Sequence, residues 1–325
     1  MSILRLTFLG TSAAAPTLHR NVSGLAVKAD SDLLLFDCGE GSQRQMIRFG
    51  TGFGVSAVFF THFHADHYLG IIGFLRTLGM GGRTDPLTLY GPPPARRILD
   101  TAIHLGVERL SFPVEIMELR GGEILQRGGY AVRAVRVDHR VNALGWILEE
   151  DTRPGRFNAD VARSLGVTPG PDFGRLQRGE TILLGNGEVV KPEQVLGPAR
   201  QGRKLVVSGD TRPCQALITA ARDADVLIHE ATFSDDEQER AEDTRHSTAR
   251  EAARVAREAG ARRLLLTHLS SRHDVDPSPL LEQARQEFKG PIDVVWDGFS
   301  LELELRGEPV RPPAAPAPAA PAQKA

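Results

Sequence analysis

Short apolar runs separated by glycine and polar turns fill the early part of the chain. The runs are rich in β-branched and aromatic residues, which is typical of strands. They predict strands over residues 4–9, 24–28, 33–37, 56–61 and 87–90. The intervening segments predict helices over residues 40–48, 68–78 and 95–105.

The later part of the chain alternates apolar strand-like runs with longer helical stretches. Strands are predicted over residues 130–137, 144–149, 204–208, 226–229, 264–267, 293–296 and 301–305. Helices are predicted over residues 215–221, 247–259 and 278–288. A strand-dominated part followed by alternating strands and helices predicts an α/β fold, in which two mixed β-sheets pack face to face with helices outside.

Two segments depart from this rhythm. Residues 150–201 are rich in glycine, proline and charge, and a stretch of that length inside a domain is either functional or a protruding subelement. Residues 306–325 are rich in proline and alanine and are expected to be disordered, because little there can anchor to a core. We therefore expect a catalytic domain over 1–305, with 150–201 inserted as an arm, and a disordered tail over 306–325.

Composition narrows the class of protein. With 325 residues, of which 41% are hydrophobic and 25% charged, the chain has the make-up of a soluble globular protein. Its net charge of -2 argues against nucleic-acid binding by bulk electrostatics, although a local basic patch stays possible. Cys38 and Cys214 suggest neither a disulfide framework nor a cysteine-based zinc site. No apolar run could span a bilayer and the chain starts with a strand-like segment, so we expect no membrane partner and a cytoplasmic location.

The run Thr-His-Phe-His-Ala-Asp-His at residues 61–67 carries the strongest chemical signal. It places three imidazoles and a carboxylate directly after a predicted strand, and these are ligands that suit zinc. Open zinc sites activate water at neutral pH. Histidines clustered on an exposed loop without metal are the alternative, but clusters of this type and spacing are seldom accidental. The run predicts a metallohydrolase.

Three further residues of the same chemistry each follow an apolar strand, where open α/β sheets present their sites. They are His139, Asp210 and His268. Each alone would be interpreted as a capping or turn residue, but together with the first cluster they provide candidate ligands for two zinc ions. One ion would take His62, His64 and His139, the other Asp66, His67 and His268, with Asp210 bridging.

Two metals about 3.5–4 Å apart can bind both an attacking hydroxide and the oxygens of a displaced group. This arrangement suits hydrolysis of a phosphodiester, and it also permits hydrolysis of a thioester, a lactone or a β-lactam.

Glu230 and His246 refine the reaction, because a histidine oriented by a carboxylate can protonate an oxyanion leaving group. The alternative is that Ser247 or Thr248 caps the following helix and His246 is merely adjacent to the cap. Asp37, before a glycine turn, either orients a ligand histidine or serves the turn alone.

The run at 61–67 resembles the HxHxDH signature of the metallo-β-lactamase superfamily, whose fold is an αβ/βα sandwich. Further motifs over residues 3 to 305 resemble the ribonuclease Z family, the endonucleases that mature tRNA 3′ ends. They are Leu-Gly-Thr-Ser at 9–12, Arg-Asn-Val-Ser at 20–23, Phe-Asp-Cys-Gly-Glu at 36–40, Ser-Gly-Asp-Thr-Arg at 208–212, His-Glu-Ala-Thr-Phe at 229–233, His-Ser-Thr at 246–248 and Leu-Thr-His-Leu-Ser at 266–270.

The resemblance implies roles for the matching positions. His62, His64, His139 and Asp210 would hold one zinc ion, and Asp66, His67, Asp210 and His268 the other. Asp66 would act as proton acceptor, and His246 with Glu230 would assist the leaving 3′ oxygen. The implied products are a tRNA with a 3′-hydroxyl and a trailer with a 5′-phosphate.

Residues 150–201 are similar to the family's flexible arm, which grips the tRNA body. Gly170 and Pro171 match the glycine–proline motif of that arm. Arg153, Arg156 and Arg163 are candidates for phosphate contacts, with solvated surface as the competing interpretation. The resemblance also implies a homodimer, in which one subunit's arm reaches the tRNA that its partner cleaves. Gln177 stands where the pattern has a lysine.

Three hypotheses follow from the sequence. The first is a zinc phosphodiesterase that acts on tRNA precursors. The second is a small-molecule hydrolase of the same superfamily, such as a thioesterase, a lactonase or a cyclic-nucleotide phosphodiesterase, for which the long arm has no use. The third is a noncatalytic RNA-binding protein, which the complete ligand set disfavours. Manganese or cobalt could occupy the same nitrogen and oxygen sites.

Overall fold

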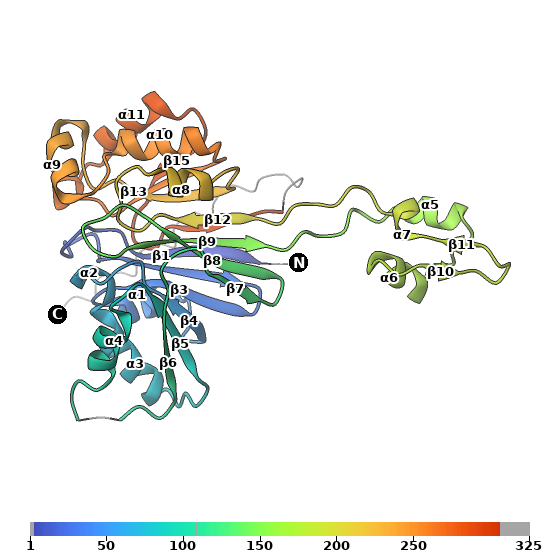
Figure 1. The fold of residues 1–325 in the computed structure, drawn as a ribbon, viewed down its shortest axis with the longest axis horizontal. Helices are drawn as coiled ribbons and strands as arrows, with labels where there is room; N and C mark the ends of the chain where they lie inside the picture. The colour runs from blue at the N-terminus through green and yellow to red at the C-terminus, as the bar shows by residue number, and fades with distance from the viewer. Residues whose placement is uncertain (1–2, 108, 306–325) are drawn as a thin grey trace, which may run out of the picture.

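The computed structural model describes residues 3–107 and 109–305, and its core is a pair of seven-stranded β-sheets packed face to face (Figure 1). The two mixed sheets flanked by helices that the sequence predicts are confirmed. The predicted disordered tail, 306–325, lies outside the described residues.

The first sheet runs in the order β16-β1-β2-β3-β4-β5-β6. Its first four strands pair antiparallel, and β3 to β6 are parallel. The strands are β1 (Leu4–Gly10), β2 (Gly24–Ala29), β3 (Asp32–Cys38), β4 (Val55–Phe59), β5 (Leu87–Gly91), β6 (Val114–Glu118) and β16 (Ser300–Glu302). Its outer face is covered by α1 (Ser42–Phe49), α3 (Gly70–Met80) and α4 (Ala95–Ile103).

The second sheet runs in the order β15-β14-β13-β12-β9-β8-β7. Strands β12 to β15 are parallel, and β7, β8, β9 and β12 pair antiparallel. The strands are β7 (Ile124–Arg127), β8 (Tyr130–Arg136), β9 (Leu144–Glu150), β12 (Lys204–Val207), β13 (Val226–Glu230), β14 (Leu264–Thr267) and β15 (Ile292–Val294).

Helices α8 (Gln215–Ala220), α10 (Ala249–Ala259) and α11 (Ser278–Glu287) pack on the outer face of the second sheet. Buried alanines of α10 let this helix lie close to β13 and β14. The other short helices of the sandwich are α2 (Ala65–Tyr68), η1 (Asp235–Glu237), α9 (Gln238–Thr244) and η2 (Ser271–His273).

Aromatic side chains fill the space between the sheets. The Phe59 ring stacks on Phe36 and Tyr90 at centroid distances of 5.1 and 5.0 Å and meets Trp146 edge-on at 5.1 Å. Such pairs stabilise a core beyond the area that they bury. Phe59 is the last residue of β4, so this packing fixes the strand from which the histidine run departs.

The predicted helix over 68–78 is divided in the structure into α2 and α3. Gly70 begins α3 and lies against the turn after β3. A Cβ at this position would come within 1.9 Å of the Gly39 carbonyl oxygen, so only glycine allows the close approach. The turn that follows β3 and the histidine run that follows β4 are therefore held against each other.

Residues beyond Glu150 leave the sandwich as a pair of extended segments and return at Arg203 (Figure 1). At their far end lies a small unit with its own apolar cluster, which includes Leu176, Ile182 and Val195. It contains α5 (Ala159–Ser164), α6 (Pro171–Gln177), β10 (Ile182–Leu183), β11 (Val189–Val190) and α7 (Pro192–Val195). We call residues 151–202 the arm.

The two extended segments of the arm pair with each other. Arg153 and Arg200 exchange backbone hydrogen bonds of 2.8 and 2.9 Å. Gly155 passes so near Gly197 that a Cβ on it would come within 1.8 Å of the Gly197 carbonyl oxygen. At the base, Arg203 donates to both carboxylate oxygens of Glu150. None of the described helices is both long enough and apolar enough to cross a membrane.

Candidate metal centre

The histidine run forms a tight turn between β4 and α2 at one edge of the sandwich. His64 is the residue that precedes α2, and Asp66 and His67 lie in its first turn. His62 is fully buried, and His67 and Asp66 are also buried. The packed strand before the turn and the short helix after it hold all four side chains in place.

Strand ends of the second sheet bring the remaining predicted residues to the same edge. His139 follows β8, Asp210 follows β12 and His268 follows β14. His268 adopts a left-handed backbone conformation with φ of 56°, which bends the chain as it leaves β14. The seven candidate ligands, from distant parts of the chain, converge.

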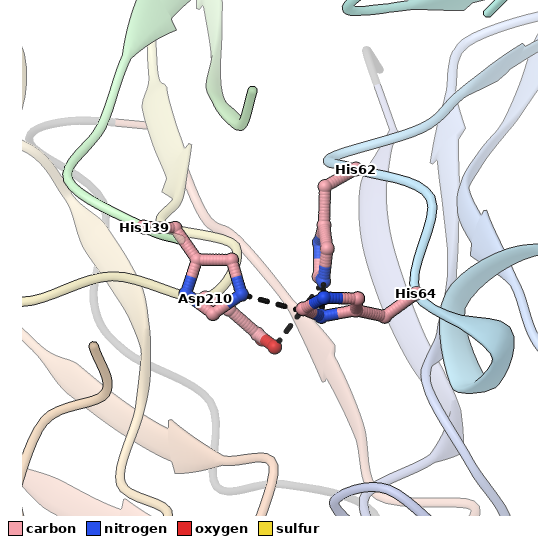
Figure 2. Close-up of side chains that lie close together, drawn as sticks. All are labelled: His62, His64, His139 and Asp210. Atoms are coloured by element: carbon pink, nitrogen blue, oxygen red, sulfur yellow. Dashed lines mark hydrogen bonds and ion pairs between the residues drawn. The ribbon is translucent and has the colours of Figure 1, made fainter. Parts of the chain in front are cut away.

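Four of these side chains form the first group (Figure 2). The His64 Nδ1 atom lies 2.9 Å from His62 Nε2 and 3.3 Å from His139 Nε2. Asp210 Oδ2 lies 3.5 Å from His62 Nε2. One ligand atom from each residue therefore faces a common point.

The second group contains Asp66, His67 and His268. Asp66 Oδ2 lies 3.4 Å from His67 Nε2 and 3.3 Å from His268 Nε2. Asp210 Oδ2 is 3.3 Å from His67 Nε2 and 3.5 Å from His268 Nε2, so it borders both groups. This is the position that a bridging carboxylate requires.

Hydrogen bonds on the far side of the imidazole rings fix which nitrogen faces the centre. His67 Nδ1 donates to Asp37 Oδ2 at 2.8 Å, and His139 Nδ1 donates to the Arg245 carbonyl oxygen at 2.9 Å. Asp37 also accepts from the Thr61 amide and hydroxyl. Of the two interpretations left open for Asp37, the structure therefore supports contact with a ligand histidine. Outer partners of this kind orient histidines at metal sites.

His268 is held in the same manner. The Thr232 hydroxyl donates to Glu230 Oε2 at 2.6 Å, so its oxygen accepts from His268 Nδ1 at 2.9 Å. With Nδ1 turned outward, Nε2 is the nitrogen that His67, His139 and His268 each present to the centre.

Charge and burial set the protonation of the cluster. Burial and the neighbouring imidazoles hold the pKa of His62 well below its ordinary value, and burial likewise lowers the pKa of His64 and His139. Burial would also lower the pKa of His67, but Asp210, Asp37 and Asp66 outweigh it and raise that pKa. Three histidines are thus neutral at neutral pH, and the carboxylates attract a positive charge to the centre.

The donor set fits a divalent metal ion. The first group offers three imidazole nitrogens and a carboxylate oxygen, and the second offers two nitrogens and two carboxylates when Asp210 is shared. Buried lone pairs and carboxylates that face one another repel unless a cation lies between them. Nitrogen and oxygen ligands in fours are typical of zinc.

Next to this cluster, His246 Nδ1 donates to Glu230 Oε1 at 2.8 Å. Burial opposes protonation, but the Glu230 charge and hydrogen bond outweigh it and raise the pKa of His246 to about 9. The His246 ring lies 5.4 Å from the His268 ring and 5.0 Å from the His139 ring. The Thr248 hydroxyl does cap α10, but the contact with Glu230 shows that His246 is not merely adjacent to that cap.

Sequence reasoning missed several residues that support the centre. Thr232 joins Glu230 to His268, and the Ala14 amide donates to Asp66 Oδ2 at 2.8 Å. Arg212 donates to the His246 carbonyl oxygen and to both oxygens of Glu251. Thr232 and Arg212 lie inside the motifs at 229–233 and 208–212, which was the one signal available for them.

Two of the three arm arginines that were candidates for phosphate contacts have carboxylate neighbours. Arg153 pairs with Glu150 at 3.0 Å, and Arg163 pairs with Asp160 at 2.6 Å. Residues 150–201 carry as many acidic as basic side chains. The net charge of residues 150–201 is therefore zero, so bulk electrostatics do not attract a ligand to this stretch.

Sequence comparisons place this site among known proteins. The profile described as Beta-lactamase superfamily domain matches residues 33–196 and 190–269. The chain is 75% identical over 306 residues to Ribonuclease Z of Myxococcus xanthus, covering 94% of this chain and all of that one. It is 52% identical over 301 residues to Ribonuclease Z of Haloferax volcanii, covering 92% and 95% of the two chains.

Solved structures share the fold. The metallo-β-lactamase fold protein YhfI of Bacillus subtilis superposes with a TM-score of 0.67 at 20% identity, covering 93% of this chain and 100% of that one. The short form of human tRNase Z superposes with a TM-score of 0.65 at 24% identity, covering 91% and 98%.

Proposed function

The chain belongs to the ribonuclease Z family, and we propose that it is a zinc-dependent endonuclease that removes the 3′ trailer from precursor tRNA. Cleavage leaves a 3′-hydroxyl on the tRNA and a 5′-phosphate on the trailer. The relatives that support this proposal match more than nine-tenths of the chain.

We propose two zinc ions per subunit. His62, His64, His139 and Asp210 would hold one, and Asp66, His67, Asp210 and His268 the other. Bound zinc would supply Lewis acidity toward the phosphodiester and toward water. The support for this assignment is the donor set and the outer hydrogen bonds that aim it inward.

Asp66 would accept the proton of the attacking water. The Ala14 amide contacts its Oδ2 atom, and the nearby histidines His67 and His268 outweigh the effect of burial and lower the pKa of Asp66. The carboxylate is therefore ionised and can receive a proton at the start of the reaction.

His246 would donate the proton that the leaving 3′ oxygen needs. Glu230 accepts from Nδ1 and stabilises the protonated ring, so Nε2 carries the proton that can be transferred. This contact is the observation that carries the proposal, because an alkoxide leaves an RNA phosphodiester poorly without a proton. Thioester and lactone opening have less need of such an acid.

The substrate side of the proposal rests on the arm. It leaves the sandwich after the C-terminal end of β9 and before the N-terminal end of β12, while Asp210 follows the opposite end of β12. A chain's arm and its own metal centre thus lie at opposite ends of the sandwich (Figure 1). We propose that the protein is a homodimer and that each arm binds the tRNA body for its partner's centre. The cytoplasmic location stays a prediction.

The test is incubation of purified zinc-loaded protein with an end-labelled precursor tRNA, alongside Asp66→Ala and His246→Ala. We expect one internal cut by the wild type, removal of the cut by a chelator, and loss of cleavage in both variants. Full activity of Asp66→Ala would contradict the mechanism. Absence of any cut, with rapid hydrolysis of a thioester or lactone instead, would support the small-molecule alternative.

A further inference from the structure

A large cavity opens beside the candidate metal centre. It encloses about 560 Å³, a volume in the range of small-molecule sites. His139 lines it, and Phe63, which lies between His62 and His64 in the chain, lines it from the other element of the centre. The start of α4 and the connection between β8 and β9 supply the remaining wall. Anything that fills this cavity therefore lies directly next to the metal ligands.

A smaller hollow continues from this cavity. The two share Pro93, Arg136 and Asn142, and the smaller one adds Arg120. Asn142 Nδ2 donates to the Pro93 carbonyl oxygen at 3.0 Å and so joins the two walls. Together the hollows form a groove that leads away from the metal centre, which we call the β8–β9 groove.

The charge of the β8–β9 groove is entirely positive. Arg120, Arg136 and Arg140 line it, and no aspartate or glutamate does. Arg136 is exposed, and within the described part of the chain its side chain makes no ion pair. Arg140 donates to the backbone oxygen of Asp243, a contact that leaves its charge uncompensated. Unpaired arginines in a groove attract phosphates.

Phe63 adds an aromatic surface. Its ring packs on Phe60 and Tyr68 at centroid distances of 5.4 and 5.7 Å and is only partly buried. Arginines beside a supported aromatic ring are the combination that binds single-stranded nucleic acid, with phosphates on the arginines and a base stacked on the ring.

The position of His246 indicates which strand would lie there. His246 does not line the cavity. His139 does, and its ring lies 5.0 Å from the His246 ring, so His139 separates His246 from the cavity. If His246 protonates the 3′ oxygen of the tRNA, the tRNA side of the cut lies toward His246. The chain on the other side of the scissile phosphate is the trailer.

We propose that the β8–β9 groove binds the first trailer nucleotides, with the first base stacked on Phe63 and the following phosphate on Arg136. This inference rests on the proposed function and adds a binding site for the departing product. On this proposal the enzyme recognises the trailer as well as the tRNA, from the first trailer base to the phosphate that precedes the second trailer nucleotide.

The phosphate contact is tested with paired substrates. One precursor tRNA carries a natural three-nucleotide trailer, and the other has an uncharged methylphosphonate between the first and second trailer nucleotides. For the wild type, kcat/KM should fall about tenfold on the uncharged substrate, as one charge-assisted contact is lost. For Arg136→Ala, kcat/KM on the natural substrate should be about tenfold below the wild-type value. Its kcat/KM values on the natural and the uncharged substrate should then differ less than about twofold. Arg133→Ala, on the same strand but outside the groove, should respond as the wild type does.

The base contact is tested with an abasic first trailer nucleotide. For the wild type and for Phe63→Tyr, kcat/KM on the abasic substrate should be about tenfold lower than on the intact one. For Phe63→Leu the two values should be nearly equal. Metal content of each variant is measured in parallel, because Phe63 adjoins two candidate ligands.

Several results would overturn the inference. The inference would fail if kcat/KM of Arg136→Ala still fell about tenfold on the substrate with the uncharged linkage. The inference would also fail if an uncharged linkage on the tRNA side of the cut slowed the wild type but not Arg136→Ala. That result would assign the groove to the tRNA end. A wild-type enzyme that cuts precursors but ignores both trailer changes would refute the groove and leave the proposed function standing. Failure to cut any precursor would refute both.

Discussion

Each histidine of the centre uses one nitrogen for the centre, and for several of them the other nitrogen has a fixed acceptor. The Nδ1–H groups of His67, His268 and His139 donate hydrogen bonds, in that order, to Asp37, to Thr232 and to the Arg245 carbonyl oxygen. The ring orientations are therefore set before any ion binds, which lowers the entropic cost of assembling the site.

At this scale the first prediction concerns the leaving group. His246→Ala should slow precursor tRNA cleavage about a hundredfold to ten-thousandfold, the usual contribution of a general acid. An aryl phosphodiester, whose phenolate leaves without a proton, should be hydrolysed at nearly the wild-type rate. Single-turnover rates on the two substrates provide the measurement. Equal losses on both would show that His246 does not act as the acid.

The sequence predicted the residues of the centre better than their contacts. Residues 61–67 concentrate four candidate ligands in one turn, so local spacing alone exposes them. The pairing of Thr232 with His268 depends on how β13 and β14 lie beside each other. That of His246 with Glu230 depends on the bridge between Phe233 and Thr248, and no single segment encodes either. Asp37 and Thr61 likewise meet only because β3 and β4 are neighbours.

At the scale of elements, β9 and β12 link the metal centre to the arm. Leu144 at the start of β9 donates to the Thr61 carbonyl oxygen, and Glu150 at its end accepts from Arg203. The ion pair is buried, so it closes the sandwich where the arm departs.

This pair predicts a pH-dependent stability. Burial would raise the pKa of Glu150, but the Arg203 hydrogen bonds and charge outweigh it and lower that pKa. The stabilisation is therefore present above the unfolded pKa of about 4.3 and is lost as the pH falls through the folded value. Glu150→Gln should lower the free energy of unfolding by about 3 kcal/mol at neutral pH.

Urea unfolding at two pH values checks this expectation. The difference between wild type and Glu150→Gln should shrink toward zero well below pH 4 or so, where both side chains are uncharged. Arg163→Gln, which removes an exposed arm pair, serves as the control and should have little effect at either pH. A difference that stays constant with pH would mean that packing, not charge, makes Glu150 important.

Most strands and helices follow from the apolar pattern, and the exceptions have physical reasons. β6 and β7 were not predicted, because they lie at the ends of their sheets and most of their side chains are partly or fully exposed. β15 and β16 are shorter than expected and begin one residue earlier, at Ile292 and Ser300. Only the neighbouring strand decides where such edge strands end.

At the scale of the whole molecule, the arm points away from the centre of its own chain. This arrangement predicts complementation between two defective variants. One variant replaces residues 154–199 with an Asn-Gly turn, which keeps the Arg153–Arg200 backbone pair and the Glu150–Arg203 ion pair. The other is Asp66→Ala, which keeps the arm.

Each variant alone should fail on precursor tRNA, while the armless variant should still hydrolyse a small aryl phosphodiester. If the arm supplies roughly 3 kcal/mol of binding free energy, its loss raises KM for the precursor about a hundredfold. After subunit exchange, a mixture of the two should regain cleavage, because a mixed dimer joins an intact arm to an intact centre. A mixture that stays inactive although mixed dimers form would show that each arm serves its own chain.

The proposed mechanism depends on two metal ions held by seven side chains from both sheets. Native mass spectrometry of the purified, zinc-saturated protein counts those ions per chain most directly, with His139→Ala measured beside the wild type. We expect two zinc ions in the wild type and a single retained ion in His139→Ala, since that residue belongs only to the first group. A wild-type chain that binds no zinc, or the same number of ions in both proteins, would contradict the two-metal centre.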